Sequence, residues 1–230
     1  MRKSLFYVLI SASIFLSACQ NQDLKQLFSV LIHTDEITSG IERSTRDLIF
    51  QVYRDEKNAK NNVEYKNWDS KRHEIQDSTE KAQKLIQSIE NEFIEKVMGG
   101  INPEDRLPRN LRVIEETENF MLGTEGKKNG KAYELEEKLN NYAKFLNKFA
   151  SDTTKIMFYP ICSRHSTCMG GVLHPKADII EYFPTRNFTN VTATQALMVL
   201  ANLRLEVARY EHRAIQEITL QYYRRKSSQL

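Results

Sequence analysis

Residues 190–223 of the chain read NVTATQALMVLANLRLEVARYEHRAIQEITLQYY, and this stretch decides the fold. Apolar side chains recur in it at steps of three and four residues, the spacing that places them on one face of a helix. They are Leu200, Leu203, Val207, Tyr210, Ala214 and Ile218. No Gly or Pro interrupts the pattern. It therefore predicts a helix over residues 193–223, about 45 Å long at 1.5 Å per residue.

A helix of this length with one apolar stripe is not stable alone in water and needs packing partners. We therefore take the stripe as a candidate interaction face, made of Leu200, Leu203, Val207, Tyr210, Ile218 and Tyr222. Other helices of the same chain are one set of candidate partners. The last turns, with Leu220 and Tyr223, extend past the expected reach of the shorter helices. A partner protein or a second copy of the chain is therefore expected there.

Three further segments show helical periodicity: residues 22–53, a helix that begins between Asp69 and Ser78 and runs to 97, and residues 131–150. A short helix is expected over 111–121, and the Lys- and Asn-rich residues 55–67 are expected to form a solvated connection. Residues 156–186 contain three prolines and two cysteines and interrupt the helical pattern. The sequence thus predicts an all-α antiparallel bundle of about four long helices, with an irregular Cys-containing excursion before the last helix.

The N-terminus resembles a bacterial lipoprotein signal. Arg2 and Lys3 precede a short apolar run, which ends in Leu-Ser-Ala-Cys at residues 16–19. The run is too short for a membrane span, which needs roughly 20 residues. We predict a signal peptide over residues 1–18, acylation of Cys19, and a single helical domain over 19–230. An ordinary signal peptide or a short signal anchor with an incidental cysteine is the alternative.

A lipid-anchored chain of this kind faces the periplasm, from the inner or the outer membrane. In that oxidising compartment Cys162 and Cys168 are expected to form a disulfide. Closing so short a loop would contribute roughly 2 kcal/mol. A metal site that also uses His165, with or without His174, is the weaker alternative, because zinc sites usually bring a second matching pair of ligands.

The sequence contains none of the common catalytic motifs. It has no phosphate-binding glycine loop, no His-Glu-x-x-His pair and no Gly-x-Ser-x-Gly elbow. The formal net charge of +3 falls to about +1 without the signal residues, so no basic field attracts nucleic acid. We therefore expect no enzyme, no cofactor, no metal and no nucleic-acid partner.

The order and character of the helices resemble the first periplasmic domain of the GldM (PorM) family. The resemblance is carried by FTNVTATQALMVLANLRLEVARYE at residues 188–211, and by EITSGIERSTR at 36–46, KLIQSIENEFIE at 84–95 and LEEKLNNYAKFL at 135–146. It covers roughly residues 35–218. The resemblance implies a dimer-forming helical bundle of the gliding-motility and type IX secretion apparatus of Bacteroidetes.

The chain departs from that family in three places. A lipoprotein signal stands where the family has a motor helix, the chain ends after the bundle, and residues around Cys162 and Cys168 look like an insertion. We expect a non-enzymatic, lipid-anchored envelope protein that binds other envelope proteins, as an accessory or paralogue of this machinery. The alternative is a lipoprotein that binds a small ligand between helices near Tyr159, Tyr182 and Phe183.

Overall fold

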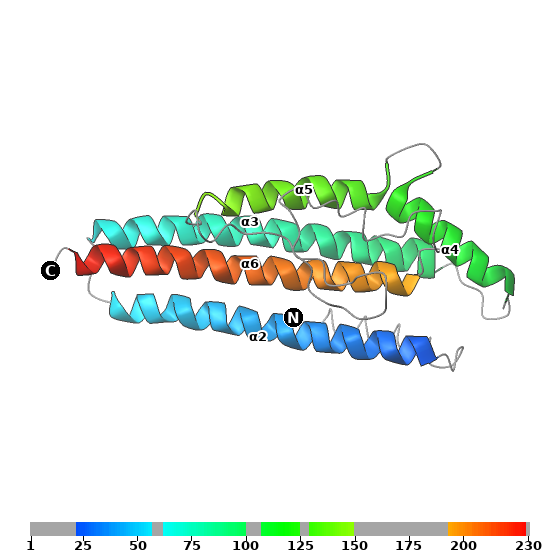
Figure 1. The fold of residues 1–230 in the computed structure, drawn as a ribbon, viewed down its shortest axis with the longest axis horizontal. Helices are drawn as coiled ribbons and strands as arrows, with labels where there is room; N and C mark the ends of the chain where they lie inside the picture. The colour runs from blue at the N-terminus through cyan, green and yellow to red at the C-terminus, as the bar shows by residue number, and fades with distance from the viewer. Residues whose placement is uncertain (1–21, 57–61, 100–106, 125–128, 150–192, 229–230) are drawn as a thin grey trace.

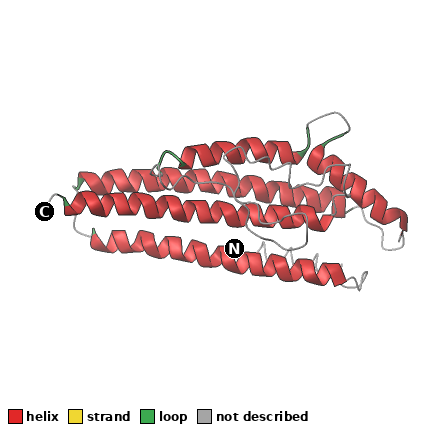
Figure 2. Cartoon of the chain, in the orientation of Figure 1, coloured by secondary structure: helices red, strands yellow, loops and turns green. Residues whose placement is uncertain are grey.

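The computed structural model describes residues 22–56, 62–99, 107–124, 129–149 and 193–228. These residues form α2 (Gln22–Asp55), α3 (Val63–Phe93), the π-helical turn η1 (Ile94–Met98), α4 (Leu107–Leu122), α5 (Lys131–Leu146) and α6 (Ala193–Ser227). Figure 2 shows helices and loops, and no strand, in the described ranges. The predicted all-α class is confirmed.

The last helix, α6, is the centre of the structure. It packs most extensively against α2 and α3, and it also contacts α4 and α5. In Figure 1, α2 and α5 lie on opposite sides of the layer that α3 and α6 form, and α4 closes one end. The helix that the sequence predicted from residue 193 thus exists and begins at that residue.

The four long helices do not all alternate in direction. Residue numbers rise together along α2 and α6, because Arg204 Nη2 lies 3.2 Å from Asp35 Oδ1 and Tyr223 Oη lies 2.6 Å from Asp55 Oδ2. Figure 1 shows that α5 also runs in this direction and that α3 alone runs the opposite way.

The predicted antiparallel arrangement is therefore correct for α3 against its neighbours and wrong for α6 against α2 and α5. The physical reason is the length of the connections. A short loop forces consecutive helices to be antiparallel, as it does for α2 and α3. Leu146 and Ala193 lie toward opposite ends of the bundle, and the segment between them is long enough to span that distance.

The core lies between α6 and the helices around it. Its largest fully buried side chains include Tyr210, Phe93, Ile86 and Leu139. One buried polar contact ties three helices together: the Tyr142 hydroxyl of α5 lies 2.8 Å from Thr79 Oγ1 of α3 and donates to the Val207 carbonyl of α6 at 3.3 Å. Burial raises the pKa of Tyr142, so this hydroxyl keeps its proton.

The helix α3 begins earlier than its composition suggests. Asn62 is its N-cap, and its side-chain oxygen accepts hydrogen bonds from the backbone N–H groups of Glu64 at 2.8 Å and Tyr65 at 3.3 Å. The predicted connection over 55–67 is therefore wrong in its second half, which is already helical. Its polar residues are solvated helix surface, while Trp68 faces the core.

The bounds of α4 and α5 also differ from the prediction. α4 starts at Leu107 rather than 111, because Pro108 is tolerated in a first helical turn. It ends at Gly123, whose φ of 87° is left-handed, and whose N–H donates to the Asn119 carbonyl. α5 ends at Leu146 rather than at residue 150.

Gly40 offers a direct test of the description of α2. It lies in the middle of this helix, and a Cβ added there meets nothing within 4 Å. We expect Gly40→Ala to raise the free energy of unfolding by about 0.5–1 kcal/mol, because glycine loses more backbone entropy than alanine in a helix. Urea unfolding followed by circular dichroism measures the change.

Gly99→Ala is the matched control. A Cβ there would lie 2.5 Å from the Glu95 carbonyl oxygen, so the same substitution should lower the stability instead. Equal effects at the two glycines would contradict the placement of Gly40 in an open helical position.

Candidate protein-interaction site at one end of the bundle

One end of the bundle gathers aromatic side chains from three helices. It is the end at which α2 finishes, α3 begins and α6 finishes. The Trp68 ring lies 5.7 Å from Tyr53, 5.9 Å from Tyr65 and 6.3 Å from Tyr222 between ring centroids. Its Nε1–H donates to Thr219 Oγ1 at 3.1 Å. Trp68 is 2% exposed, so this cluster fixes how the three helix ends meet.

A buried carboxylate lies beside this cluster. Glu56 is 5% exposed, and its Oε1 accepts hydrogen bonds from the Tyr222 hydroxyl and from the Lys226 ammonium group. A charge buried in this way costs free energy unless it is paired. Lys226 therefore neutralises the buried Glu56 carboxylate, and it is not available to bind a partner.

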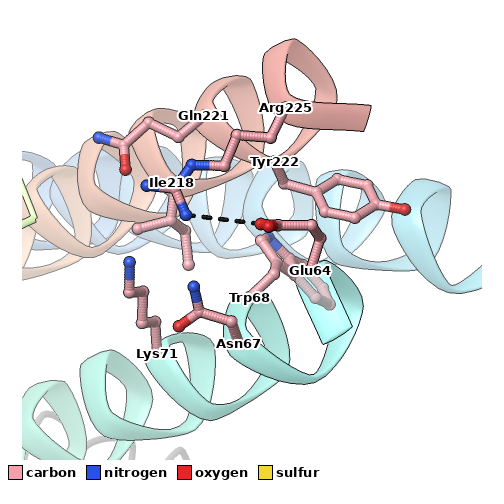
Figure 3. Close-up of a pocket in the computed structure, with 8 residues that line it drawn as sticks. All are labelled: Glu64, Asn67, Trp68, Lys71, Ile218, Gln221, Tyr222 and Arg225. Carbon is pink, nitrogen blue, oxygen red and sulfur yellow. Dashed lines mark hydrogen bonds and ion pairs between the residues drawn. The ribbon is translucent and has the colours of Figure 1, made fainter. Parts of the chain in front are cut away.

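A shallow groove runs between the first turns of α3 and the last turns of α6 (Figure 3). The residues that line it are Glu64, Asn67, Trp68, Lys71, Ile218, Gln221, Tyr222 and Arg225. Its enclosed space holds about one water molecule. It is therefore a surface on which a protein could dock, and it is too small for an organic ligand.

At this end of the bundle the carboxylates are paired with other described residues, whereas several cationic side chains are not. The carboxylates Asp55, Glu56, Glu64 and Asp69 each have a partner within the chain. Among the described residues, four cationic side chains at the same end have no ion-pair or hydrogen-bond partner. They are Arg54, Lys66, Lys71 and Arg224. The end of the bundle thus presents positive charge that nothing in the described chain neutralises.

A second polar region joins the middle of α2, between Asp35 and Thr45, to α6. Thr45 Oγ1 lies 3.0 Å from His212 Nδ1, and Arg204 reaches both Asp35 of α2 and Glu90 of α3. Ile49 and Val52, in the last turns of α2, are the buried apolar residues of this helix that belong to the core. The contacts of α2 with the bundle thus combine polar pairs at Asp35 and Thr45 with apolar packing at Ile49 and Val52.

Glu211 lies in this polar region. Burial, and to a smaller extent the nearby Glu42 carboxylate of α2, raise its pKa to about 7, while the hydrogen bond with the Gln76 side chain of α3 acts in the opposite direction. Burial also lowers the pKa of the neighbouring His212. Both groups therefore favour their neutral forms in the folded chain.

This yields a pH prediction. An unperturbed glutamate has a pKa of 4.5, so the folded chain binds the Glu211 proton more tightly than the unfolded chain does. The stability contributed by this group is present in full below about pH 4.5 and lost as the pH rises through about 7. This shift of the Glu211 pKa changes the free energy of unfolding by about 3 kcal/mol at most.

Glu211→Gln should remove this loss of stability at high pH. At pH 8 the variant should therefore unfold at a higher urea concentration than the wild type. The difference between the two proteins should shrink at pH 4.5, where both side chains are neutral. Urea titrations at the two pH values measure it, and Glu74→Gln, at an exposed position of α3, is the control. A difference that does not vary with pH would contradict the assignment.

The six residues taken as a candidate interaction face lie inside the bundle. Their exposed fractions run from 0 to 8% for Leu200, Leu203, Val207, Tyr210, Ile218 and Tyr222. Other helices of the chain cover them, including Tyr222 in the last turns, whereas Leu220 is 50% exposed. In this fold a second protein cannot reach them without opening the bundle.

The predicted lipidation site Cys19 and the predicted disulfide partners Cys162 and Cys168 lie outside the described residues. The same holds for Tyr159, Tyr182 and Phe183, around which the alternative ligand pocket was placed. In the described ranges, no group of three His, Cys, Asp or Glu residues could hold a metal ion. No helix in those ranges is long and apolar enough to cross a membrane.

Sequence reasoning missed the groove and the cluster around Trp68. A signal was present, because Tyr65 and Trp68 follow Asn62 at helical spacing. The polar composition of the surrounding residues concealed it.

The chain was compared with models of known protein families. Residues 47–221 match the model of the GldM N-terminal domain. The chain belongs to this family. The GldM domain makes it a protein related to gliding motility and type IX secretion, in a family that works through protein contacts in the cell envelope. No curated protein and no solved structure was found to match.

The GldM match covers a slightly different range from the expected 35–218. It begins at 47, so the stretch at 36–46 lies before it, and it ends at 221. The start falls where α2 begins to bury apolar side chains, at Ile49 and Val52. The matched range thus contains the apolar core of the bundle and most of the groove, which α3 and α6 form.

Proposed function

We propose that this chain is a lipid-anchored, non-enzymatic envelope protein that binds protein partners of the gliding and type IX secretion machinery. The family match carries the proposal. The structure supports a binding role at one end of the bundle, where cationic side chains that are unpaired among the described residues lie beside a groove. The apolar stripe of α6 is buried in the core and does not serve this role.

Crosslinking in cells tests the proposal. The full chain, expressed at its natural level, is treated with a reversible crosslinker and purified under denaturing conditions. We expect gliding or type IX secretion components among the recovered proteins. Recovery of no envelope protein would contradict the proposal.

The anchor is tested separately. In the proposal, Cys19 carries the acyl chains, and each buried methylene contributes about 0.8 kcal/mol to membrane binding. Cys19→Ala should move the chain from the membrane fraction to the soluble fraction after cell breakage. Cys168→Ala is the control and should leave the distribution unchanged. Unchanged membrane association of Cys19→Ala would refute acylation at this residue.

In the proposed orientation the groove lies far from the membrane. The acylated cysteine precedes α2, whose 34 residues span about 50 Å. α2 ends at the end of the bundle that carries the groove. The site is therefore held where proteins of the periplasm can reach it.

A further inference from the structure

We propose that the groove between α3 and α6 binds an acidic segment of an envelope protein, with a carboxylate between Lys71 and Arg225. The inference rests on the proposed function and adds the chemistry of the partner. It follows from the donors in the groove and the exposed Val63 beside them, together with the proposed distance of the groove from the membrane.

The groove gathers nitrogen donors. In Figure 3 the Lys71 ammonium and the Asn67 side-chain nitrogen point from α3 toward α6, and the Arg225 guanidinium reaches over Ile218 from the other side. Lys71 has no partner in the described part of the chain. Arg225 meets a single carboxylate, Glu64, at 3.4 Å and stays half exposed.

These donors favour an anionic group. Lys71 is half buried, so its charge is less well solvated than that of a lysine on an open surface. A carboxylate placed between Lys71 and Arg225 would accept charge-assisted hydrogen bonds from both, which are shorter and stronger than neutral ones.

The surface beside the groove favours a protein segment. Ile218 and Trp68 line the groove but are only 3% and 2% exposed, so they offer a partner little apolar surface. Val63, which is 76% exposed, lies four residues before Asn67 and so on the same face of α3. An acidic side chain with an apolar neighbour can pair with the donors and cover Val63. The position, about 50 Å of helix away from the anchor, favours a protein over the lipid headgroups of the chain's own membrane.

Photo-crosslinking from Val63 tests the inference in cells that express the full chain. Val63 is replaced by a photo-reactive phenylalanine analogue, and the crosslinked peptide is identified by mass spectrometry. We expect a peptide rich in Asp and Glu. Adding Lys71→Glu should reduce the crosslink yield at least tenfold, because it replaces attraction by repulsion. Lys71→Arg should retain it.

Lys138→Glu is the matched control, because Lys138 is an exposed residue of α5 away from the groove. It should leave the yield unchanged, and the urea midpoint of Lys71→Glu should equal that of the wild type. A second photo-crosslinker at the exposed Glu95, in η1 after the far end of α3, separates the two proposals.

Protein crosslinks from position 95 with none from position 63 would overturn the inference and leave the proposed function standing. Crosslinks from position 63 that are insensitive to Lys71→Glu would also overturn it, as would crosslinks to phospholipid. Absence of protein crosslinks at both positions would count against both proposals.

Discussion

Trp68→Ala is expected to lower the free energy of unfolding by about 3–5 kcal/mol, the usual cost of removing a large buried aromatic side chain. Trp68 is 2% exposed and contacts Tyr53, Tyr65 and Tyr222, so its removal empties the space where three helices meet. It also leaves Thr219 Oγ1 without the indole donor.

Circular dichroism during urea unfolding measures this effect, because the substitution removes the only tryptophan of the chain. Trp68→Phe separates the two contributions. It keeps an aromatic ring but loses the hydrogen bond to Thr219, so a smaller loss of about 1–2 kcal/mol is expected. A loss below about 1 kcal/mol for Trp68→Ala would mean that the three helix ends do not meet as described.

Leu200→Ala is expected to lower the free energy of unfolding by about 2–5 kcal/mol. Leu200 is fully buried near the start of α6, and the cavity left by its side chain would lie in the core. Leu220→Ala is the matched control, since Leu220 is on the same helix but 50% exposed. This substitution should change the free energy of unfolding by no more than about 0.5 kcal/mol, as is usual at the surface.

Equal losses at Leu200 and Leu220 would contradict the assignment of the stripe to the core. The same urea titration measures both variants. Because each replaces leucine by alanine in one helix, intrinsic helix propensity contributes equally to the two values.

The sequence predicted α6 well, because its apolar spacing is long and uninterrupted. The predicted direction of α6 relative to α2 was wrong, and the sequence left open whether other helices, a partner protein or a second copy covers the stripe. Periodicity defines which face of a helix is apolar, but it carries no information about the helix that packs there. The interaction face was therefore a sound prediction of burial that left the covering partner open.

The start of α3 shows the limit of composition. Residues 62–67 are mostly Asn, Glu, Lys and Tyr, which are as common in exposed loops as on the solvated face of a helix. The Asn62 cap and the position of Trp68 decide between the two, and both become visible only in the structure. The groove was beyond prediction for a similar reason. It depends on the pairing of Trp68 with Thr219 and of Glu64 with Arg225 across two helices far apart in sequence.

The central claim is that the stripe of α6 builds the core and that partners bind elsewhere. The most direct test is the amount of crosslinked envelope partner recovered per molecule of folded chain, measured in cells for Leu200→Ala and for the wild type. We predict that Leu200→Ala lowers the stability and the level of folded chain but leaves the partner recovered per folded molecule unchanged. A large fall in that ratio, with the stability of the chain unchanged, would contradict the claim and show that the stripe is the interface.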